Sequence, residues 1–171
     1  MKKISKITMG LDKVSNTPVV FLLLEKTHLA LPIWIGPCEA GIMAMSLKKE
    51  IFERPLTHDL YLNSLKKLNY NVNKIVITKI EKNIFYSSII LTDSNENIIE
   101  IDSRPSDSII LGVKSEVPIY LDDDLAINNT VEVDFIGDED AERDDLKKIL
   151  DEFNIDNMKD YFDKDDEWIY W

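Results

Sequence analysis

Two short stretches of the sequence share a pattern that suits the binding of an anion. They are Arg54-Pro55-Leu56-Thr57-His58-Asp59 and Arg104-Pro105-Ser106-Asp107, and each places an arginine and a proline before a predicted helix start. Proline favours extended backbone in the preceding residue, and a hydroxyl residue can then cap the helix. Free backbone N–H groups, the positive end of the helix dipole and a nearby guanidinium together attract phosphate. The pattern therefore predicts a substrate-binding group formed by Arg54, Thr57, Arg104 and Ser106.

The same pattern also has a structural interpretation. A proline, a hydroxyl cap and an acid in the first turn are the usual parts of a stable helix start. Asp59 and Asp107 would complement the helix dipole there without any ligand. From the spacing alone, capping is favoured over phosphate binding.

Titratable side chains near the predicted element ends could supply acid–base chemistry. Hydrolysis of a phosphodiester needs a base for the attacking water, positive charge near the phosphoryl oxygens and often carboxylates that hold a divalent metal. His58 could act as the base, and carboxylates could bind Mg²⁺ or Mn²⁺, although the sequence does not specify the ligands. A lone histidine beside a helix cap is also common in structural roles. The predicted catalytic set consists of Glu39, His58, Asp59, Asp102 and Asp107.

Several other chemistries lack their motifs. The sequence has no glycine-rich phosphate loop, no paired cysteine motif and no G-x-S-x-G turn. These absences argue against a nucleotide triphosphatase, a zinc ribbon and a serine hydrolase. Cys38 is the only cysteine, so no internal disulfide can form, and we expect it to be a small buried side chain.

Composition indicates a soluble globular protein. The chain has 171 residues, of which 44% are hydrophobic and 30% charged, which suits one domain with a core plus a modest appendage. No apolar run approaches the ~20 residues that a membrane-spanning helix needs, and the N-terminus lacks a signal-peptide pattern. We therefore expect a cytoplasmic protein with no membrane partner.

The negative charge lies mainly in the last part of the chain. The net charge is −12, yet residues 1–120 carry 15 Lys and Arg against 13 Asp and Glu. We divide the chain into a domain of residues 1–136 and an acidic, partly helical segment of residues 137–171. In that segment, four apolar residues recur at helical spacing: Leu146, Ile149, Leu150 and Phe153. An acidic run is usually a solvated surface without a specific role. If it has a function here, we expect it to bind a partner or to inhibit the domain.

Hydrophobic periodicity predicts an α+β fold. Strands over 3–11, 18–25 and 29–35 should form one antiparallel meander, and strands over 72–80, 85–92 and 98–102 a second. Helices should begin at Pro37, extending to Ile51, at Thr57, ending near Asn69, and at Ser106. Further strands are expected over 118–121 and 131–136. The expected architecture is thus a largely antiparallel or mixed sheet with about three packed helices and a short helical C-terminal appendage.

Four ordered motifs in residues 1–125 together resemble the bifunctional nuclease domain family. They are Leu31-Pro32-Ile33-Trp34-Ile35-Gly36-Pro37-Cys38-Glu39-Ala40, the Arg54 motif, Glu100-Ile101-Asp102-Ser103-Arg104-Pro105-Ser106-Asp107-Ser108-Ile109, and Val117-Pro118-Ile119-Tyr120. The resemblance implies an α+β fold and nuclease activity on DNA and RNA. It also implies that the nine polar residues predicted above belong to the family's motifs.

Two functions are compatible with the sequence. The first is a metal-assisted nuclease in which the arginines hold phosphate and His58 or an acid activates water. The second is a non-catalytic nucleic-acid- or protein-binding regulatory module, in which the motifs hold helix caps and a homo-oligomer interface. The nearly neutral body favours the second function somewhat. The first predicts that the polar motif residues line one depression.

Overall fold

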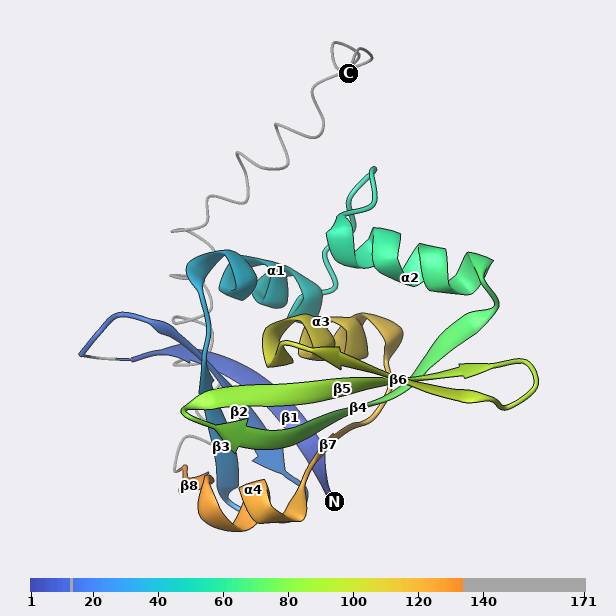
Figure 1. Cartoon of the computed structure of the whole chain (residues 1–171). Coiled ribbons are helices and arrows are strands. Elements are labelled where there is room, and N and C mark those ends of the chain that lie inside the picture. The colour runs from blue at the N-terminus through green and yellow to red at the C-terminus, as the bar shows by residue number, and fades with distance from the viewer. Residues whose placement is uncertain (13, 134–171) are drawn as a thin grey trace.

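The protein is described by a computed structural model that covers residues 1–12 and 14–133. Its strands form one mixed sheet in the order β6-β5-β4-β7-β1-β2-β3-β8 (Figure 1). The strands are β1 (Lys2–Leu11), β2 (Pro18–Leu24), β3 (Leu29–Trp34), β4 (Tyr70–Glu81), β5 (Ile84–Asp93), β6 (Ile98–Ser103), β7 (Ile119–Leu121) and β8 (Val131–Glu132). The helices are α1 (Pro37–Leu47), α2 (Thr57–Lys67), α3 (Pro105–Ser115) and α4 (Asp123–Asn128). The predicted α+β fold class is confirmed.

Both predicted meanders are present. Strands β1 to β3 pair antiparallel in succession, and so do β4 to β6. The short strand β7 joins the two halves, because it pairs parallel with Ile75–Ile77 of β4 and antiparallel with Lys2 and Lys3 of β1. Lys82 and Asn83 connect β4 to β5 with positive φ angles of 50° and 63°. Two such residues form the tight hairpin turn whose twist matches the strands.

Helices α1, α2 and α3 form a layer over the sheet (Figure 1). Met43 and Ala44 of α1 and Ile109 and Ile110 of α3 are fully buried in the main core. Gly112 of α3 approaches the sheet so closely that a Cβ atom there would lie 2.9 Å from Cγ1 of Ile75. A larger residue would therefore displace α3, and with it the polar residues at its start.

The predicted helix caps were wrong. Thr57 and Ser106 lie inside α2 and α3, and the N-caps are Leu56 and Arg104, whose side chains do not cap. At α3 the reason is Pro105, which occupies the first helical position and places Arg104 one residue outside the helix. Residue Ser106 is consequently buried, with 7% of its surface exposed.

The apolar face of α2 is narrower than the spacing of its leucines indicates. Leu60 and Leu68 are 59% and 67% exposed, whereas Leu65 is buried and Tyr61 packs against the core. Helix α1 ends at Leu47, so Ile51 lies beyond it and is 91% exposed. In both cases an apolar residue fits a helical period but does not contact the sheet: Leu60 and Leu68 fall outside the buried stripe of α2, and Ile51 lies beyond the end of α1.

Three further expectations concern single residues or short segments. Cys38 is exposed rather than buried, because it lies in the first turn of α1 on the side away from the core. Helix α4 was not predicted; its cap is Asp122, whose side chain accepts a hydrogen bond from the backbone of Asp124 at 3.0 Å.

Strand β8 covers the start of the strand expected over 131–136. The predicted boundary at 136 and the predicted partly helical segment of residues 137–171 lie outside the described residues. No helix in the described ranges is long and apolar enough to span a membrane.

Candidate functional site

Arg104 is the centre of an ion-pair cluster that joins two helix starts. Its Nη1 donates to Oε1 of Glu39 at 2.8 Å. Its Nε donates to Oδ2 of Asp107 at 2.8 Å, and its Nη2 donates to Oδ1 of the same carboxylate at 3.2 Å. A planar guanidinium that contacts both oxygens of one carboxylate is fixed in orientation. Glu39 lies in the first turn of α1, so this contact ties α1 to α3.

His58 lies behind Asp107 and connects α2 to the same group. Its Nε2 lies 3.5 Å from Oδ1 of Asp107, and its side chain is only 12% exposed. Its Nδ1 is buried and has no hydrogen-bond partner among the described residues. We refer to Glu39, His58, Arg104 and Asp107 as the arginine cluster. The cluster brings the Arg54 and Arg104 motifs together on the helical layer.

The electrostatics of the arginine cluster favour a neutral histidine and a permanent cation. Burial lowers the pKa of His58, and the negative charge of Asp107 opposes this shift only in part. Hydrogen bonds and charge from Asp107, with those from Glu39, raise the pKa of Arg104. With a neutral imidazole, the cluster contains two carboxylates and one cation. An incoming phosphate would therefore compete with Glu39 and Asp107 for the guanidinium.

Exposure shows which members of the cluster can reach a ligand. The side chain of Arg104 is 66% exposed, against 33% for Asp107 and 25% for Glu39. Arg104 and the two carboxylates thus reach solvent, whereas His58 is largely enclosed. The accessible chemistry of the cluster is that of a guanidinium held between two proton acceptors.

Asp59 belongs to a second ion pair beside the cluster. Its Oδ1 accepts from Nζ of Lys114 at 2.8 Å, and its Oδ2 accepts from the backbone N–H of Leu56 at 3.0 Å. Asp59 therefore both caps α2 and ties it to α3. Lys114 was not among the predicted residues, although it follows Asp107 by two helical turns and so lies on the same side of α3. Its charge also lowers the pKa of His58.

Asp102 is not part of the cluster. Its neighbour Ser103 contacts Ser87 at 2.9 Å between their hydroxyl groups, and Ser87 in turn contacts Ser108 of α3 at 2.8 Å. Successive residues of a strand point to opposite faces of a sheet, so Asp102 faces away from the helical layer. Its charge acts on Lys79 instead.

Arg54 and Thr57 also differ from the cluster residues. Both are exposed, and among the described residues neither forms a hydrogen bond or an ion pair with the cluster. Of the nine predicted site residues, the structure joins Glu39, His58, Arg104 and Asp107 directly and places Asp59 alongside them. Ser106 is buried beneath the start of α3.

Two buried serines, Ser87 and Ser108, and the half-buried Ser103 support the start of α3, and none of them was predicted as a site residue. Ser87 of β5 donates to the carbonyl of Ser103 at 2.8 Å, and Ser108 of α3 donates to Ser87. Ser87 and Ser108 are fully buried. Buried hydroxyl groups with partners fix local geometry, so these residues hold Arg104 in place from below. The period-2 pattern of β5 places Ser87 on the core face, which is the one sequence signal for it.

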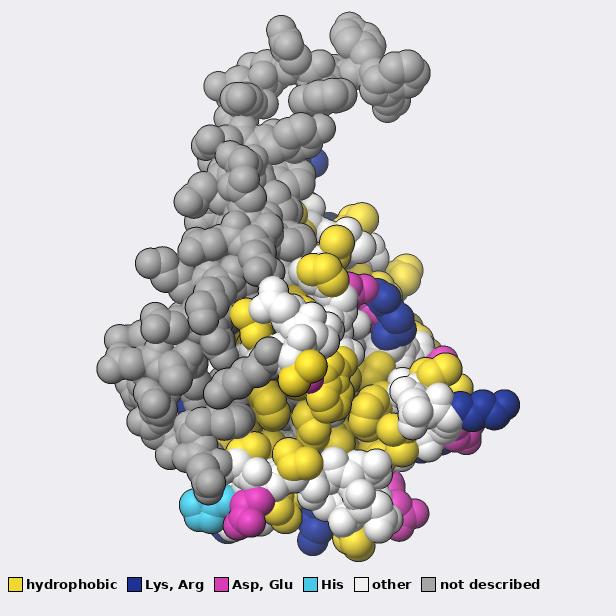
Figure 2. All heavy atoms as spheres, turned by 90° about the vertical axis from the view of Figure 1, so that its left-hand side faces the viewer, with side chains coloured by type: hydrophobic (Ala, Val, Ile, Leu, Met, Phe, Trp, Pro, Cys, Tyr) yellow, Lys and Arg dark blue, Asp and Glu magenta, His cyan; other side chains and the backbone are white. Residues whose placement is uncertain are grey.

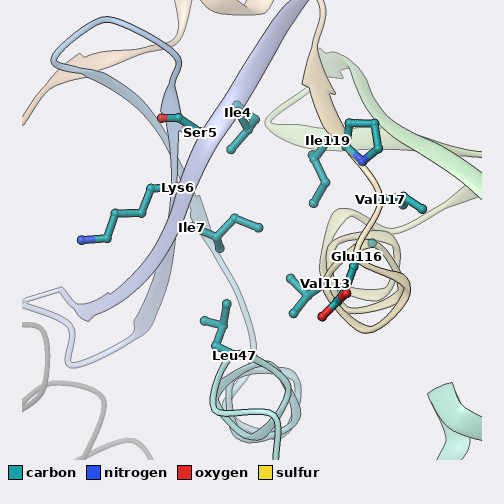
Figure 3. A pocket seen from close by; sticks show the side chains of 11 residues that line it. Ile4, Ser5, Lys6, Ile7, Leu47, Val113, Glu116, Val117 and Ile119 are labelled. Atoms are coloured by element: carbon teal, nitrogen blue, oxygen red, sulfur yellow. The ribbon is translucent and has the colours of Figure 1, made fainter.

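A separate groove lies between β1, α1 and α3. Figure 3 shows Ile7, Leu47, Val113 and Ile119 pointing into it from these elements and β7. Its volume is about 230 Å³, and its lining is mainly apolar. Hydrophobic side chains also gather in the middle of the face shown in Figure 2. The groove contains no cluster of titratable groups, so it does not compete with the arginine cluster as a catalytic site.

Comparisons with known proteins place the chain in a family. The bifunctional nuclease domain matches residues 20–134, which include every residue of the arginine cluster. An uncharacterized protein of Mycobacterium tuberculosis is 28% identical over 166 residues, covering 93% of this chain and 99% of that protein. Bifunctional nuclease 1 of Oryza sativa subsp. japonica is 24% identical, and bifunctional nuclease 1 of Arabidopsis thaliana is 22% identical. Both plant matches cover 71% of this chain and 38% of the relative. The chain therefore belongs to the bifunctional nuclease domain family.

Proposed function

We propose that the protein is a nuclease that hydrolyses phosphodiester bonds of DNA, RNA or both at the arginine cluster. The observation that carries this proposal is the contact of both Arg-Pro motifs through His58 and Asp107, next to the exposed guanidinium of Arg104. Relatives that are named bifunctional nucleases share the domain containing these motifs. Cytoplasmic location and a homo-oligomeric state remain predictions from the sequence.

Arg104 is the residue that binds the scissile phosphate. Its guanidinium is held from two sides but remains exposed, so a phosphoryl oxygen can approach it without passing through the protein. Asp107 contacts it through two hydrogen bonds and Glu39 through one. The phosphate therefore displaces Glu39 more readily than Asp107. Positive charge held in advance at the phosphoryl oxygens lowers the barrier to attack by water.

Glu39 is the proton acceptor in this scheme. Once phosphate replaces it on Arg104, its carboxylate is free to accept a proton from the attacking water. The water oxygen forms the new bond to phosphorus, the bond to the leaving oxygen breaks, and the leaving oxygen takes a proton from solvent. Glu39 is one-quarter exposed, so it can reach water.

His58 acts through Asp107 and not on the water. A carboxylate only accepts hydrogen bonds, so the neutral imidazole must place its proton on Nε2, which faces Asp107. That nitrogen then has no lone pair to take a proton. His58 is thus a positioning residue that fixes Asp107, which in turn fixes Arg104. This role differs from that of the general base expected from the sequence.

The sequence suggested that Mg²⁺ or Mn²⁺ assists the reaction, but the arrangement of the described side chains does not favour a bound cation. Within the described ranges, no three His, Cys, Asp or Glu side chains are grouped so that they could hold a metal. Both carboxylates of the cluster are engaged by Arg104. We therefore assign no step to a metal.

The test is a cleavage assay on the full chain with end-labelled single-stranded DNA and RNA, with EDTA, Mg²⁺ or Mn²⁺. Arg104→Gln should abolish cleavage, while Lys82→Gln, which removes a cation from the exposed β4–β5 turn, should not. Cleavage by Arg104→Gln at the rate of the unchanged protein would exclude the arginine cluster as the site. Failure of the pure protein to cleave either substrate under all three conditions would exclude the nuclease function.

The second candidate function is a non-catalytic binding module. It is favoured by one observation: the ion pairs of Arg104 and Lys114 connect α1, α2 and α3, as a structural clamp would. In that case Arg104→Gln would lower the melting temperature strongly. At a temperature where both proteins are equally folded, the variant would bind nucleic acid as tightly as the unchanged protein. Measuring binding by fluorescence anisotropy below the melting transition distinguishes the two functions.

A further inference from the structure

Strand β2 is buried on both of its faces. Its seven residues are all buried except Phe21, which is half-buried. Val20 and Leu22 belong to the main core beneath the helices. Val19 and Leu23 point the other way, yet they are only 2% and 3% exposed. A strand with both faces buried requires a cover on each side of its sheet.

The outer face of β1 to β3 is apolar across three cross-strand rows. We define it as the face opposite α1, and its side chains alternate with those of the core. The pairing places Gly10, Val19 and Trp34 in one row and Thr8, Phe21 and Pro32 in the next. Leu23 and Ala30 are paired in the third row. Ala30 is fully buried and Thr8 is 6% exposed, so the burial extends beyond β2.

The described chain ends on this outer face. Val133 donates its backbone N–H to the carbonyl of His28 at 2.9 Å. Its side chain packs with Leu23 and Ala30 in an apolar cluster separate from the main core. Within the described ranges, Val133 is the only member of that cluster from outside β2 and β3. The residues that follow it therefore start from the surface that needs a cover.

The sequence after Val133 contains a suitable cover. Leu146, Ile149, Leu150 and Phe153 recur at the spacing that places them on one side of a helix, and charged residues fill the positions between them. The residues between Val133 and Leu146 can span about 40 Å when extended. Three neighbouring strands measure about 10 Å across, so the apolar stripe can reach any part of the outer face.

The extent of the bacterial match supports this assignment. The match to the mycobacterial protein covers 93% of the chain, about 159 of 171 residues, and so must continue beyond Val133. The matches to the plant proteins cover 71% of the chain. The segment after Val133 thus accompanies the domain in a relative of nearly the same extent.

We propose that the segment of residues 137–171 docks on the outer face of β1 to β3 through Leu146, Ile149, Leu150 and Phe153. Its acidic residues then face solvent, and the segment completes the fold as the second cover of β2. The arginine cluster lies on the helical layer, on the opposite side of the sheet, so the docked segment leaves the cluster uncovered.

Trp34 provides a reporter on the outer face. It is 54% exposed, and the other two tryptophans, Trp168 and Trp171, lie in the acidic segment. In a full-length Trp168→Phe, Trp171→Phe background, fluorescence therefore arises from Trp34 alone. The test variant adds Leu150→Asp and Phe153→Asp. The matched control adds Lys148→Asp, which makes the same change in net charge at a position opposite the apolar stripe.

Docking predicts that the test variant shifts the Trp34 emission to longer wavelength, raises its acrylamide quenching constant and lowers the melting temperature by several degrees. The control should leave all three unchanged. Unchanged emission and quenching in the test variant would overturn the proposal. So would emission that depends on protein concentration in the background protein, because a second copy would then be the cover. Nuclease activity is not a readout, so failure of the proposed function leaves this test intact.

Discussion

His58 of α2 and Asp107 of α3 are 49 residues apart in the sequence, yet Nε2 of the histidine is 3.5 Å from Oδ1 of the aspartate. This contact joins α2 to α3 and links the two Arg-Pro motifs. Because Asp107 also holds Arg104, a change at the enclosed histidine reaches the exposed guanidinium through a single carboxylate.

A change in pH should alter stability through His58. Burial lowers its pKa in the folded protein, so the unfolded chain binds this proton more tightly. Stability is therefore present in full above the ordinary pKa of about 6.5 and is lost as pH falls from there towards the folded-state value. Urea midpoints at pH 7.5 and 5.5 should show a drop that His58→Gln reduces. The matched variant His28→Gln, at an exposed site, should retain the drop. A drop of equal size in both variants would contradict the assignment.

Gly36→Ala should disturb the arginine cluster without removing a charge. The backbone of Gly36 is extended, with φ of −70°, which alanine adopts without strain. A Cβ atom there would contact Oε2 of Glu39, so the carboxylate must move. We expect cleavage to fall by about tenfold or more, in line with the loss of one positioned acid–base group, while the melting temperature changes little. Unchanged cleavage by a folded Gly36→Ala protein would argue against a role for Glu39 in proton transfer.

Asp59 should contribute to stability more than an exposed ion pair does. Replacing it with Ala removes a cap from the backbone of Leu56 and leaves Lys114, only 16% exposed, without its partner. The expected loss is about 1–3 kcal/mol in the free energy of unfolding. Glu116→Gln, which removes the partner of exposed Lys49, serves as the control and should have no measurable effect. Equal effects of the two changes would show that Asp59 is not a structural tie.

Gly112→Ala should destabilise the packing of α3 on the sheet. Its Cβ would lie 2.9 Å from Ile75 and 3.0 Å from Ile119. Overpacking of this kind costs about 1–3 kcal/mol. Chemical unfolding should show the loss, and a second change, Ile119→Val, should recover part of it by removing the methyl group in contact. If the double variant recovers no stability, the loss does not come from the contact between residues 112 and 119.

Most of the elements could be predicted because their signals are local. Runs of aliphatic and β-branched residues bounded by turn residues define β1 to β6, and Pro37 marks a helix start. The long-range relations could not be predicted in this way. The parallel pairing of β7 with β4 and the contact of Arg104 with Glu39 depend on how distant segments pack.

The candidate site shows the same division. The two motifs identified His58, Arg104 and Asp107 by residue type, and Glu39 was identified by its place near a predicted helix start. Asp102 could not be separated from these residues, because its proximity to Arg104 in the sequence conceals its orientation. One residue along β6 reverses the face to which a side chain points. Lys114 lies on the same side of α3 as Asp107. Its ion pair with Asp59 could not be predicted, because the sequence does not show that α2 lies beside α3.

The most direct test of the account compares two acids from one motif. Full-length Asp107→Asn and Asp102→Asn carry the same chemical change five residues apart, one beside Arg104 and one on the opposite face of the sheet. Cleavage of labelled RNA and single-stranded DNA under single-turnover conditions gives kcat/KM for each. We expect Asp107→Asn to lower kcat/KM by about 100-fold or more, as for a group that positions the catalytic machinery, and Asp102→Asn to cleave at the rate of the unchanged protein. Equal rates in the two variants, or a loss confined to Asp102→Asn, would contradict the assignment of the arginine cluster as the active site.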